Sequence, residues 1–186
     1  MKNLFLSFSL ITLLTGCSQT FVNQNPVGKP FPNVEAESLE QTFHTLPEYF
    51  DGRQVVLLIG YKQNSQFDID RWLIGLDMKQ VQADVYELPT IQGWVPSLIK
   101  GTINEGMRKG IPEDIWRIVL TIYEDGTKVQ QFTGNENPNN ARVMVLDEGG
   151  NVLYFYDRGF SVSALNALNA TVEQGVQTAA KTNKKS

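Results

Sequence analysis

Residues with the chemistry of a catalytic or metal site are few in this chain of 186 amino acids. It has one cysteine, Cys17, and one histidine, His44. Zinc sites take several Cys or His ligands, so we expect neither a bound metal nor a thiolate-held cofactor. The remaining candidates are a carboxylate pair, Asp68 and Asp70, and the hydroxyl of Ser65, a nucleophile that would need His44 as its base.

Each candidate also has a structural interpretation, which we favour. A helix predicted to begin near Ser65 places Asp68 and Asp70 in its first turn, where the helix dipole stabilises negative charge. Ser65 would then cap that helix, and His44 would be a surface or loop residue near the first strands. We therefore predict no catalytic residue and expect a binding protein more than an enzyme.

The first residues have the pattern of an export signal. Met1-Lys2 precedes an apolar run from Leu4 to Leu14, and the small residue Gly16 comes just before Cys17. A basic start, a short apolar core and small residues before a cleavage point are typical of a secretory signal peptide. The run has about 11 residues, fewer than the about 20 that span a bilayer. Leu14-Thr15-Gly16-Cys17 resembles the lipobox of bacterial lipoproteins.

This resemblance implies cleavage before Cys17 and its acylation by fatty acids such as palmitate, with the lipid bilayer as a partner. An ordinary secretory signal with an incidental cysteine is the alternative. Ser18 replaces the Asp that favours inner-membrane retention in that family, which implies the outer membrane, facing the periplasm. The predicted organisation is a signal peptide (1–16), lipidated Cys and polar tether (17–27), one domain (28–180) and a polar tail (181–186).

Composition limits the class of the domain. With 41% hydrophobic and 10% aromatic residues, the chain is globular, and it is long enough for one full core. Its net charge is −4, and it has no basic block outside the tail at 181–185. Nucleic-acid binding is therefore not expected.

Hydrophobic periodicity predicts an alternation of strands and helices. One or two short edge strands are expected between Phe31 and Phe43. Three further strands are predicted before the last part of the chain, at Val55–Ile59, Val81–Leu88 and Trp116–Tyr123. The predicted helices are Ser65–Lys79 with a stripe of Ile69, Trp72, Leu73 and Leu76; Pro96 to Ile111 with Ile99, Ile103 and Met107; and Asp125–Phe132, ended by Gly134. A hairpin of Ala141–Leu146 and Val152–Tyr156 precedes a helix from Ser163 with Leu165, Leu168, Val172 and Val176 buried.

Strands separated by helices imply a parallel layer, to which the hairpin adds an antiparallel edge. This order, with Gly28-Lys29-Pro30-Phe31-Pro32 at the start and Arg142–Asp147 before Gly149-Gly150, resembles the thioredoxin-like fold in its peroxiredoxin-like form. It also resembles the thioredoxin-like chaperone that assembles mitochondrial ATP synthase. The resemblance covers residues 28–178 and implies a three-layer α/β sandwich with a mixed central sheet, a C-terminal hairpin and a final helix.

The sequence departs from that family where its chemistry is done. Thioredoxins and peroxiredoxins carry the nucleophilic Cys where the first central strand meets its helix, but Gly60–Phe67 contains no cysteine. The cis-proline that thioredoxins place before the hairpin is also missing, since Asn140-Ala141-Arg142 occupies that region. No catalytic residue of the family can be carried over, and a redox role would need an unmodified Cys17.

These observations favour a membrane-anchored, non-catalytic module that binds another envelope protein. The predicted partner surface is the former active-site end, with Lys62, Gln63, Asn64 and Trp94. The alternatives are a non-thiol enzyme that uses Asp68 and Asp70, and a small-ligand protein with a cleft near Trp94. The other two tryptophans, Trp72 and Trp116, are expected in the core.

Overall fold

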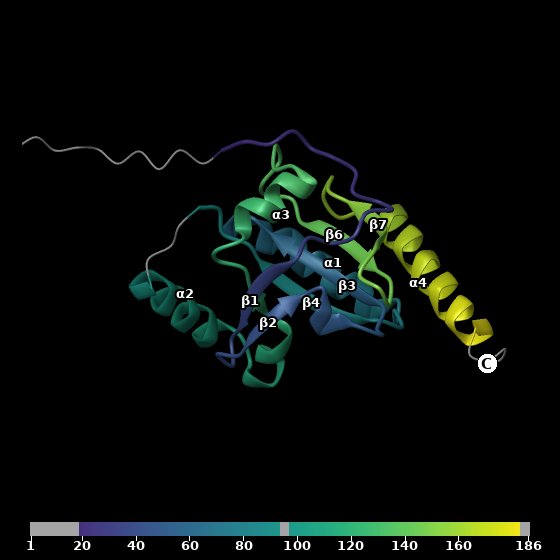
Figure 1. Ribbon diagram of the computed structural model, residues 1–186, viewed down its shortest axis with the longest axis horizontal. Helices are drawn as coiled ribbons and strands as arrows, with labels where there is room; N and C mark the ends of the chain where they lie inside the picture. The colour runs from purple at the N-terminus through teal and green to yellow at the C-terminus, as the bar shows by residue number, and fades with distance from the viewer. Residues whose placement is uncertain (1–18, 94–96, 183–186) are drawn as a thin grey trace, which may run out of the picture.

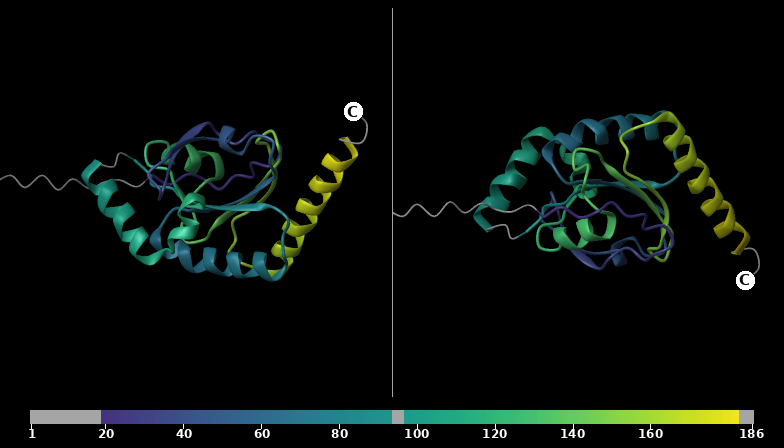
Figure 2. Two further views of the ribbon diagram at one scale, coloured as in Figure 1. Left: turned by 90° about the horizontal axis from the view of Figure 1, so that it is seen from below. Right: turned by 90° about the horizontal axis from the view of Figure 1, so that it is seen from above.

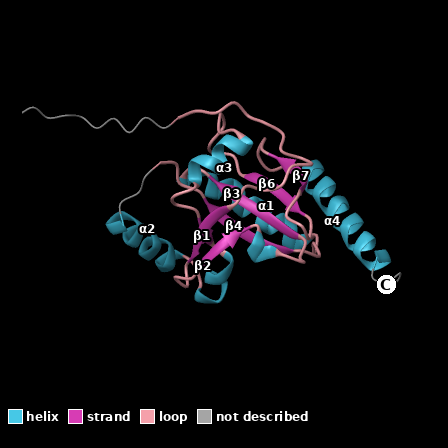
Figure 3. Cartoon of the chain, in the orientation of Figure 1, coloured by secondary structure: helices cyan, strands magenta, loops and turns pink. Residues whose placement is uncertain are grey.

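The computed structural model describes residues 19–93 and 97–182 (Figure 1). Cys17 and Trp94 lie outside the described residues, so the predictions made for them stay predictions. Figure 3 shows helices and strands mixed throughout the chain. None of the helices in the described ranges is both long and apolar enough to cross a membrane.

A four-stranded sheet with the order β4-β3-β6-β7 forms the centre of the domain. Its strands are β3 (Val55–Gly60), β4 (Asp84–Pro89), β6 (Arg142–Leu146) and β7 (Val152–Tyr156). β3 pairs in parallel with β4 and antiparallel with β6, and β6 and β7 form the predicted hairpin. Every residue of β3 and β6 is buried; apart from Arg142 at the start of β6, both strands are the continuous apolar runs expected where both faces are covered.

Two layers cover this sheet, as Figure 2 shows from opposite sides. On one face α1 (Gln66–Met78) and α4 (Val162–Thr182) pack against Val56 and Leu58. On the other face α3 (Gly126–Thr133) and a second sheet pack against Leu57 and Ile59. The mixed sheet, the hairpin and the final helix confirm the predicted three-layer fold.

The second sheet has the order β2-β1-β5, with β1 at Val34–Ser38, β2 at Phe43–Leu46 and β5 at Leu120–Thr121. The strand predicted over Trp116–Tyr123 is wrong in its first half, because Glu113–Ile118 form a 3₁₀ helix and β5 has only 2 residues. Pro112 precedes this helix, and Glu113 and Asp114 lie in its first turn, where negative charge is favourable. The Trp116 indole N–H donates to the Ile111 carbonyl at 2.9 Å, which holds the turn.

The predicted buried stripes of α1 and α4 are correct except at one residue each. Ile69, Trp72 and Leu76 are buried, but Leu73 is 36% exposed. A Cβ on Gly75 would lie 2.9 Å from the Leu165 side chain, so α1 meets α4 at Gly75 and turns Leu73 outward. Val176 is 47% exposed because the last turns of α4 extend past the sheet (Figure 1).

The helix α2 (Ser97–Gly110) forms as predicted, but its apolar stripe does not face the domain. Asn104 is 4% exposed, whereas Ile99 is 49% exposed and Ile103 and Met107 are half-buried. The side of α2 that faces β1 carries polar residues, of which Asn104 bonds to Tyr123 and Glu37. The apolar spacing therefore identified the helix and misplaced its buried side.

Residues 19–27, for which the sequence predicts a polar tether, lie in extended form along the domain; we call them the N-terminal strap. The Gln24 N–H donates to the Thr133 carbonyl at 3.0 Å, and the Asn135 N–H donates to the Phe21 carbonyl at 3.0 Å. Gly134, at φ 77°, makes this approach possible, since a Cβ there would lie 2.2 Å from Asn23 Cα. The strap is therefore held against α3 and the loop that follows it.

Candidate functional site

The candidate site is the junction between β3 and α1, where the sequence predicts a partner surface. Lys62, Gln63 and Asn64 are exposed in a short 3₁₀ turn that leads into α1. Ser65 is buried, and its hydroxyl donates to the Lys62 carbonyl at 2.6 Å. The structure thus presents three polar side chains to solvent, while the nearby hydroxyl is already bonded within the loop.

Ser65 does not cap α1, which corrects the prediction made for it. Its backbone is already helical, at φ −66° and ψ −17°, whereas a capping residue needs an extended backbone to reach the next amides. The serine–histidine pair is not formed either. His44 lies on β2 and stacks on Tyr49 with a centroid distance of 4.0 Å, and burial lowers its pKa.

Next to this loop, Tyr61, which follows β3, and Arg142, the first residue of β6, form a buried polar contact. The Arg142 guanidinium lies 4.8 Å from the Tyr61 ring centre and donates to the Asn137 and Asn140 carbonyls at 2.6 and 2.9 Å. The Tyr61 hydroxyl bonds to Thr133 of α3, and burial raises its pKa to about 12. Burial also lowers the pKa of Arg142, whose charge faces carbonyls and a ring.

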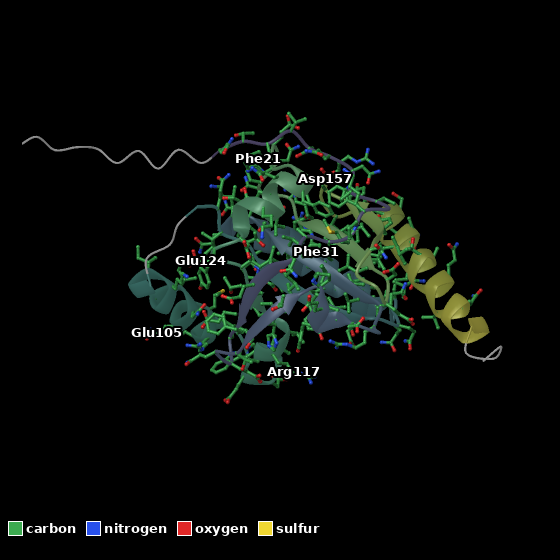
Figure 4. All side chains as sticks on the ribbon, in the orientation of Figure 1. Phe21, Phe31, Glu105, Arg117, Glu124 and Asp157 are labelled. Carbon is green, nitrogen blue, oxygen red and sulfur yellow. The ribbon has the colours of Figure 1, made fainter. Side chains whose placement is uncertain are left out.

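This contact also reaches the N-terminal strap, because Arg142 Nη2 lies 3.5 Å from Asn23 Oδ1. The strap thus passes over the end of the sheet from which Lys62–Asn64 extend. Figure 4 shows Phe21, the strap residue labelled there, on the same side of the molecule as α3. This link was not predictable from the sequence, where Arg142 is a single polar residue at the start of a predicted strand.

Asp68 is neither a simple helix charge nor part of a paired-carboxylate site. Its side chain is 6% exposed and accepts backbone N–H groups from Ala141 at 2.9 Å and Phe160 at 2.7 Å. It therefore joins the start of α1 to the start of β6 and to the segment before α4. Each of its oxygens is held by a backbone donor, which suits a structural role.

Asp70 instead belongs to a group with exposed Gln66 and half-buried Glu87 of β4. The Gln66 amide donates to Asp70 Oδ1 at 2.9 Å and lies 3.5 Å from Glu87 Oε2. Burial raises the pKa of Glu87 to about 6, and Asp70 adds to the shift while the bond from Gln66 opposes it. The carboxylate that interacts with Asp70 is thus Glu87 of β4, 17 positions later in sequence, and not Asp68.

Of the two tryptophans expected in the core, only Trp72 is there. Trp72 is 0% exposed and packs on Tyr156 and Phe160 in the core. Trp116 is half-buried under Arg108 rather than in a core strand. The aromatic residue that the sequence missed is Phe67, which is 70% exposed at the start of α1. Phe67 lies outside the Ile69–Trp72–Leu76 stripe of α1, and this spacing could have indicated that it is exposed.

A polar hollow of about 460 Å³ lies between α2 and the second sheet. Tyr123 donates to Asn104 Oδ1 at 2.6 Å on its wall, and burial raises the pKa of Tyr123 to about 12. Two buried polar atoms on this wall, Thr121 Oγ1 and Arg108 Nη2, form no hydrogen bond of acceptable geometry within the described chain. The Thr121 hydroxyl is close enough to Tyr123 to oppose the rise in its pKa.

A larger and more open hollow of about 1170 Å³ lies at the other end of the central sheet, against α4, with Arg53 and Asp84 on its rim. Neither hollow is lined by Asp68 or Asp70. Within residues 19–93 and 97–182, no group of three or more His, Cys, Asp or Glu side chains is placed to hold a metal ion.

Similarity to known proteins supports the fold of this chain and no more specific property. No family model and no curated protein matches the sequence. A putative protein disulfide isomerase from Bacteroides thetaiotaomicron has a TM-score of 0.55 at 11% identity, over 87% of this chain and 99% of that chain. BsSco, of the Sco family of cytochrome c oxidase assembly proteins, has a TM-score of 0.54 at 9% identity, over 82% and 96%.

A SCO1/SenC family lipoprotein from Bacillus anthracis has a TM-score of 0.53 at 12% identity, over 83% of this chain and 99% of that chain. At such identities the likeness concerns the backbone alone. Together with the β4-β3-β6-β7 sheet and its flanking helices, it shows that this chain has a thioredoxin-like fold.

Proposed function

We propose that the protein is a lipid-anchored envelope module that binds another envelope protein through the end of its thioredoxin-like domain. The observation that carries this proposal is the junction of β3 and α1. There the chain presents Lys62, Gln63 and Asn64 to solvent, has no thiol, and commits the Ser65 hydroxyl to a backbone carbonyl. A thiol-disulfide oxidoreductase needs a thiolate at its reacting centre, whereas a binding surface needs exposed groups on a rigid base.

The base of this surface is rigid. Asp68 joins α1 to two other segments, and Arg142 joins β6 to Tyr61 and the strap. Exposed Phe67 adds an aromatic side chain beside the three polar ones. Aromatic residues at the centre of an interface often contribute most of its binding energy, so Phe67 completes the proposed surface.

The proposed anchor is acylated Cys17, and the proposed location is the periplasmic face of the outer membrane. The support is the order of charge, apolar run, small residues and Cys in the first 17 residues. Two fold neighbours are described as lipoproteins, from Bacillus anthracis and Streptococcus pneumoniae. Intact mass and membrane flotation, with Cys17→Ala as control, test the anchor: an unmodified Cys17 thiol contradicts it.

The partner surface is tested by crosslinking and affinity capture of the full chain from its own envelope. A Lys62→Ala/Asn64→Ala/Phe67→Ala variant should lose every specific partner and keep its unfolding midpoint, because these side chains are exposed. The matched control is Asp77→Ala/Met78→Ala, at the exposed far end of the same helix. Equal capture by the two variants would place the surface elsewhere.

A second candidate function is capture of a small polar ligand in the hollow beside α2. Its volume of about 460 Å³ is within the range of about 300–1,000 Å³ usual for ligand pockets. Thr121 Oγ1 and Arg108 Nη2 favour it, because buried polar atoms without partners are rare and suit a ligand with acceptors. On the wall Glu124 already pairs with Lys100, and the remaining carboxylates, those of Glu35, Glu37 and Glu105, favour a ligand that also carries a positive charge.

Free amino acids and dipeptides have this combination, so they are the probes. At 100 times its Kd such a ligand stabilises by about 2.7 kcal/mol and should raise the Tm by about 5–10 °C. Thr121→Val should abolish that shift, since it removes the hydroxyl and keeps the shape. An absence of any shift across the probes would leave the hollow without this role.

A further inference from the structure

The N-terminal strap is docked on the domain almost from its first described residue. The Gln19 carbonyl accepts the side-chain amides of Gln92 at 2.8 Å and Asn135 at 2.9 Å. The Asn135 carboxamide oxygen also accepts the Phe21 N–H at 2.7 Å. The side chain of one buried asparagine, 7% exposed, thus binds the backbone of the strap at both Gln19 and Phe21.

The strap stays docked beyond that point. Asn23 and Glu136 exchange two hydrogen bonds, from the Asn23 N–H at 3.0 Å and from the Glu136 N–H at 3.1 Å. Gly134 lies against Asn23 with no room for a side chain. The segment between residue 19 and β1 is therefore not a flexible linker between the domain and Cys17.

Only two residue steps separate Cys17 from Gln19. A fully extended chain spans at most about 3.6 Å per residue, so the docked carbonyl of Gln19 lies within about 7 Å of the Cys17 backbone. A domain of this size has a radius of gyration of about 15 Å, so the distance between its opposite faces is much longer than this tether. A lipid on Cys17 would therefore fix which side of the domain faces the membrane.

We propose that the face formed by the strap and α3 lies against the lipid bilayer, which holds the domain in one orientation; this rests on the lipid anchor proposed above. Residues 19–27 contain no charged side chain, and Lys128 of α3 offsets the exposed Glu136 beside the strap, so this face carries no excess of negative charge to be repelled by an anionic lipid surface. Phe21 and Arg117 lie at opposite sides of the molecule in Figure 4, so Arg117 and the 3₁₀ helix that carries it point away from the bilayer.

The test compares two single labels on the full acylated chain. With the only native cysteine acylated, Gln131→Cys on α3 and Arg117→Cys each give one thiol for a fluorophore, and both side chains are exposed. The proteins are placed in vesicles of phosphatidylethanolamine and phosphatidylglycerol that contain nitroxide-headgroup lipid. The proposal predicts severalfold stronger quenching at position 131 than at position 117.

Two variants test whether the docked strap causes this difference. A flexible insert of about 20 Gly and Ser residues between Ser18 and Gln19 adds a reach of about 25 Å and should abolish the difference without altering the domain. Gly134→Ala should reduce it by displacing the strap. Gly52→Ala is the matched control, because Gly52 has φ 70° but no atom within 4 Å of a new Cβ.

Mass and flotation of each protein separate the two proposals. A chain that floats and carries lipid but is quenched equally at both positions contradicts the orientation and leaves the anchor intact. A quenching difference that survives the flexible insert also contradicts it. A chain without lipid contradicts both.

Discussion

Asp68 provides a prediction that separates two physical interpretations of the same carboxylate. If Asp68 and Asp70 act only through the helix dipole, each contributes about 0.3–1 kcal/mol and their replacements by alanine have similar effects. The structure predicts unequal effects. Asp68 is 6% exposed and accepts the N–H groups of Ala141 and Phe160, whereas Asp70 is exposed.

The magnitude follows from those two donors. Asp68→Ala leaves two N–H groups without their partner, and a buried unsatisfied group costs about 1–3 kcal/mol. Because Asp68 is slightly exposed, we expect about 1.5 kcal/mol for each N–H group, or about 3 kcal/mol in total. For a domain of this size that is a fall in Tm of about 6–12 °C.

Asp68→Asn keeps one carbonyl oxygen as acceptor and should lose about half as much. Asp70→Ala should change the free energy of unfolding by no more than about 0.5–1 kcal/mol. Urea unfolding followed by tryptophan fluorescence measures all three, with Trp72 as a buried probe. Similar small losses for Asp68→Ala and Asp70→Ala would refute the reasoning.

Three further changes have expected outcomes. Burial raises the pKa of Glu87 from 4.5 to about 6, so folding favours its protonated form and stability falls as pH rises from about 4.5 through 6. Glu87→Gln should remove that pH dependence and stabilise the protein by about 1 kcal/mol at pH 7. Urea unfolding of both proteins at about pH 4.5 and at pH 7 measures this. Arg142→Lys should destabilise by about 2–3 kcal/mol, because an ammonium cannot reproduce the two carbonyl bonds and the ring contact, and denaturation beside the exposed control Arg117→Lys measures it. Ser65→Ala should lower stability by only about 0.5–1.5 kcal/mol and leave partner capture unchanged, and a loss of capture would return Ser65 to consideration as a functional group.

The central sheet was predictable because its sequence pattern has one physical cause. Val55–Gly60 and Val143–Leu146 are buried on both faces, and their continuous apolar runs are typical of such strands. The hairpin was predictable from Asp147–Gly150, since the turn residues restrict the backbone locally. These features depend on neighbours in sequence.

The features that the sequence did not reveal depend on partners far away in the chain. Asp68 bonds to residues 73 and 92 positions later, and Asn23 meets Arg142 across 119 positions. Periodicity also cannot say which side of α2 meets a polar wall, so Asn104 was missed while Ile99 was expected inside. The partner surface at Lys62–Asn64 is exposed as its position suggested, and its binding role stays a prediction.

The central claim is that a lipid-anchored domain binds an envelope protein through the Lys62–Asn64 end. Its most direct test places a photocrosslinking residue at Gln63 in cells, with Asp77 at the far end of α1 as the control site. The account predicts one discrete adduct from Gln63, none from Asp77, and loss of the Gln63 adduct when Cys17→Ala removes the anchor. No adduct from Gln63, or the same adduct from both sites, would contradict it.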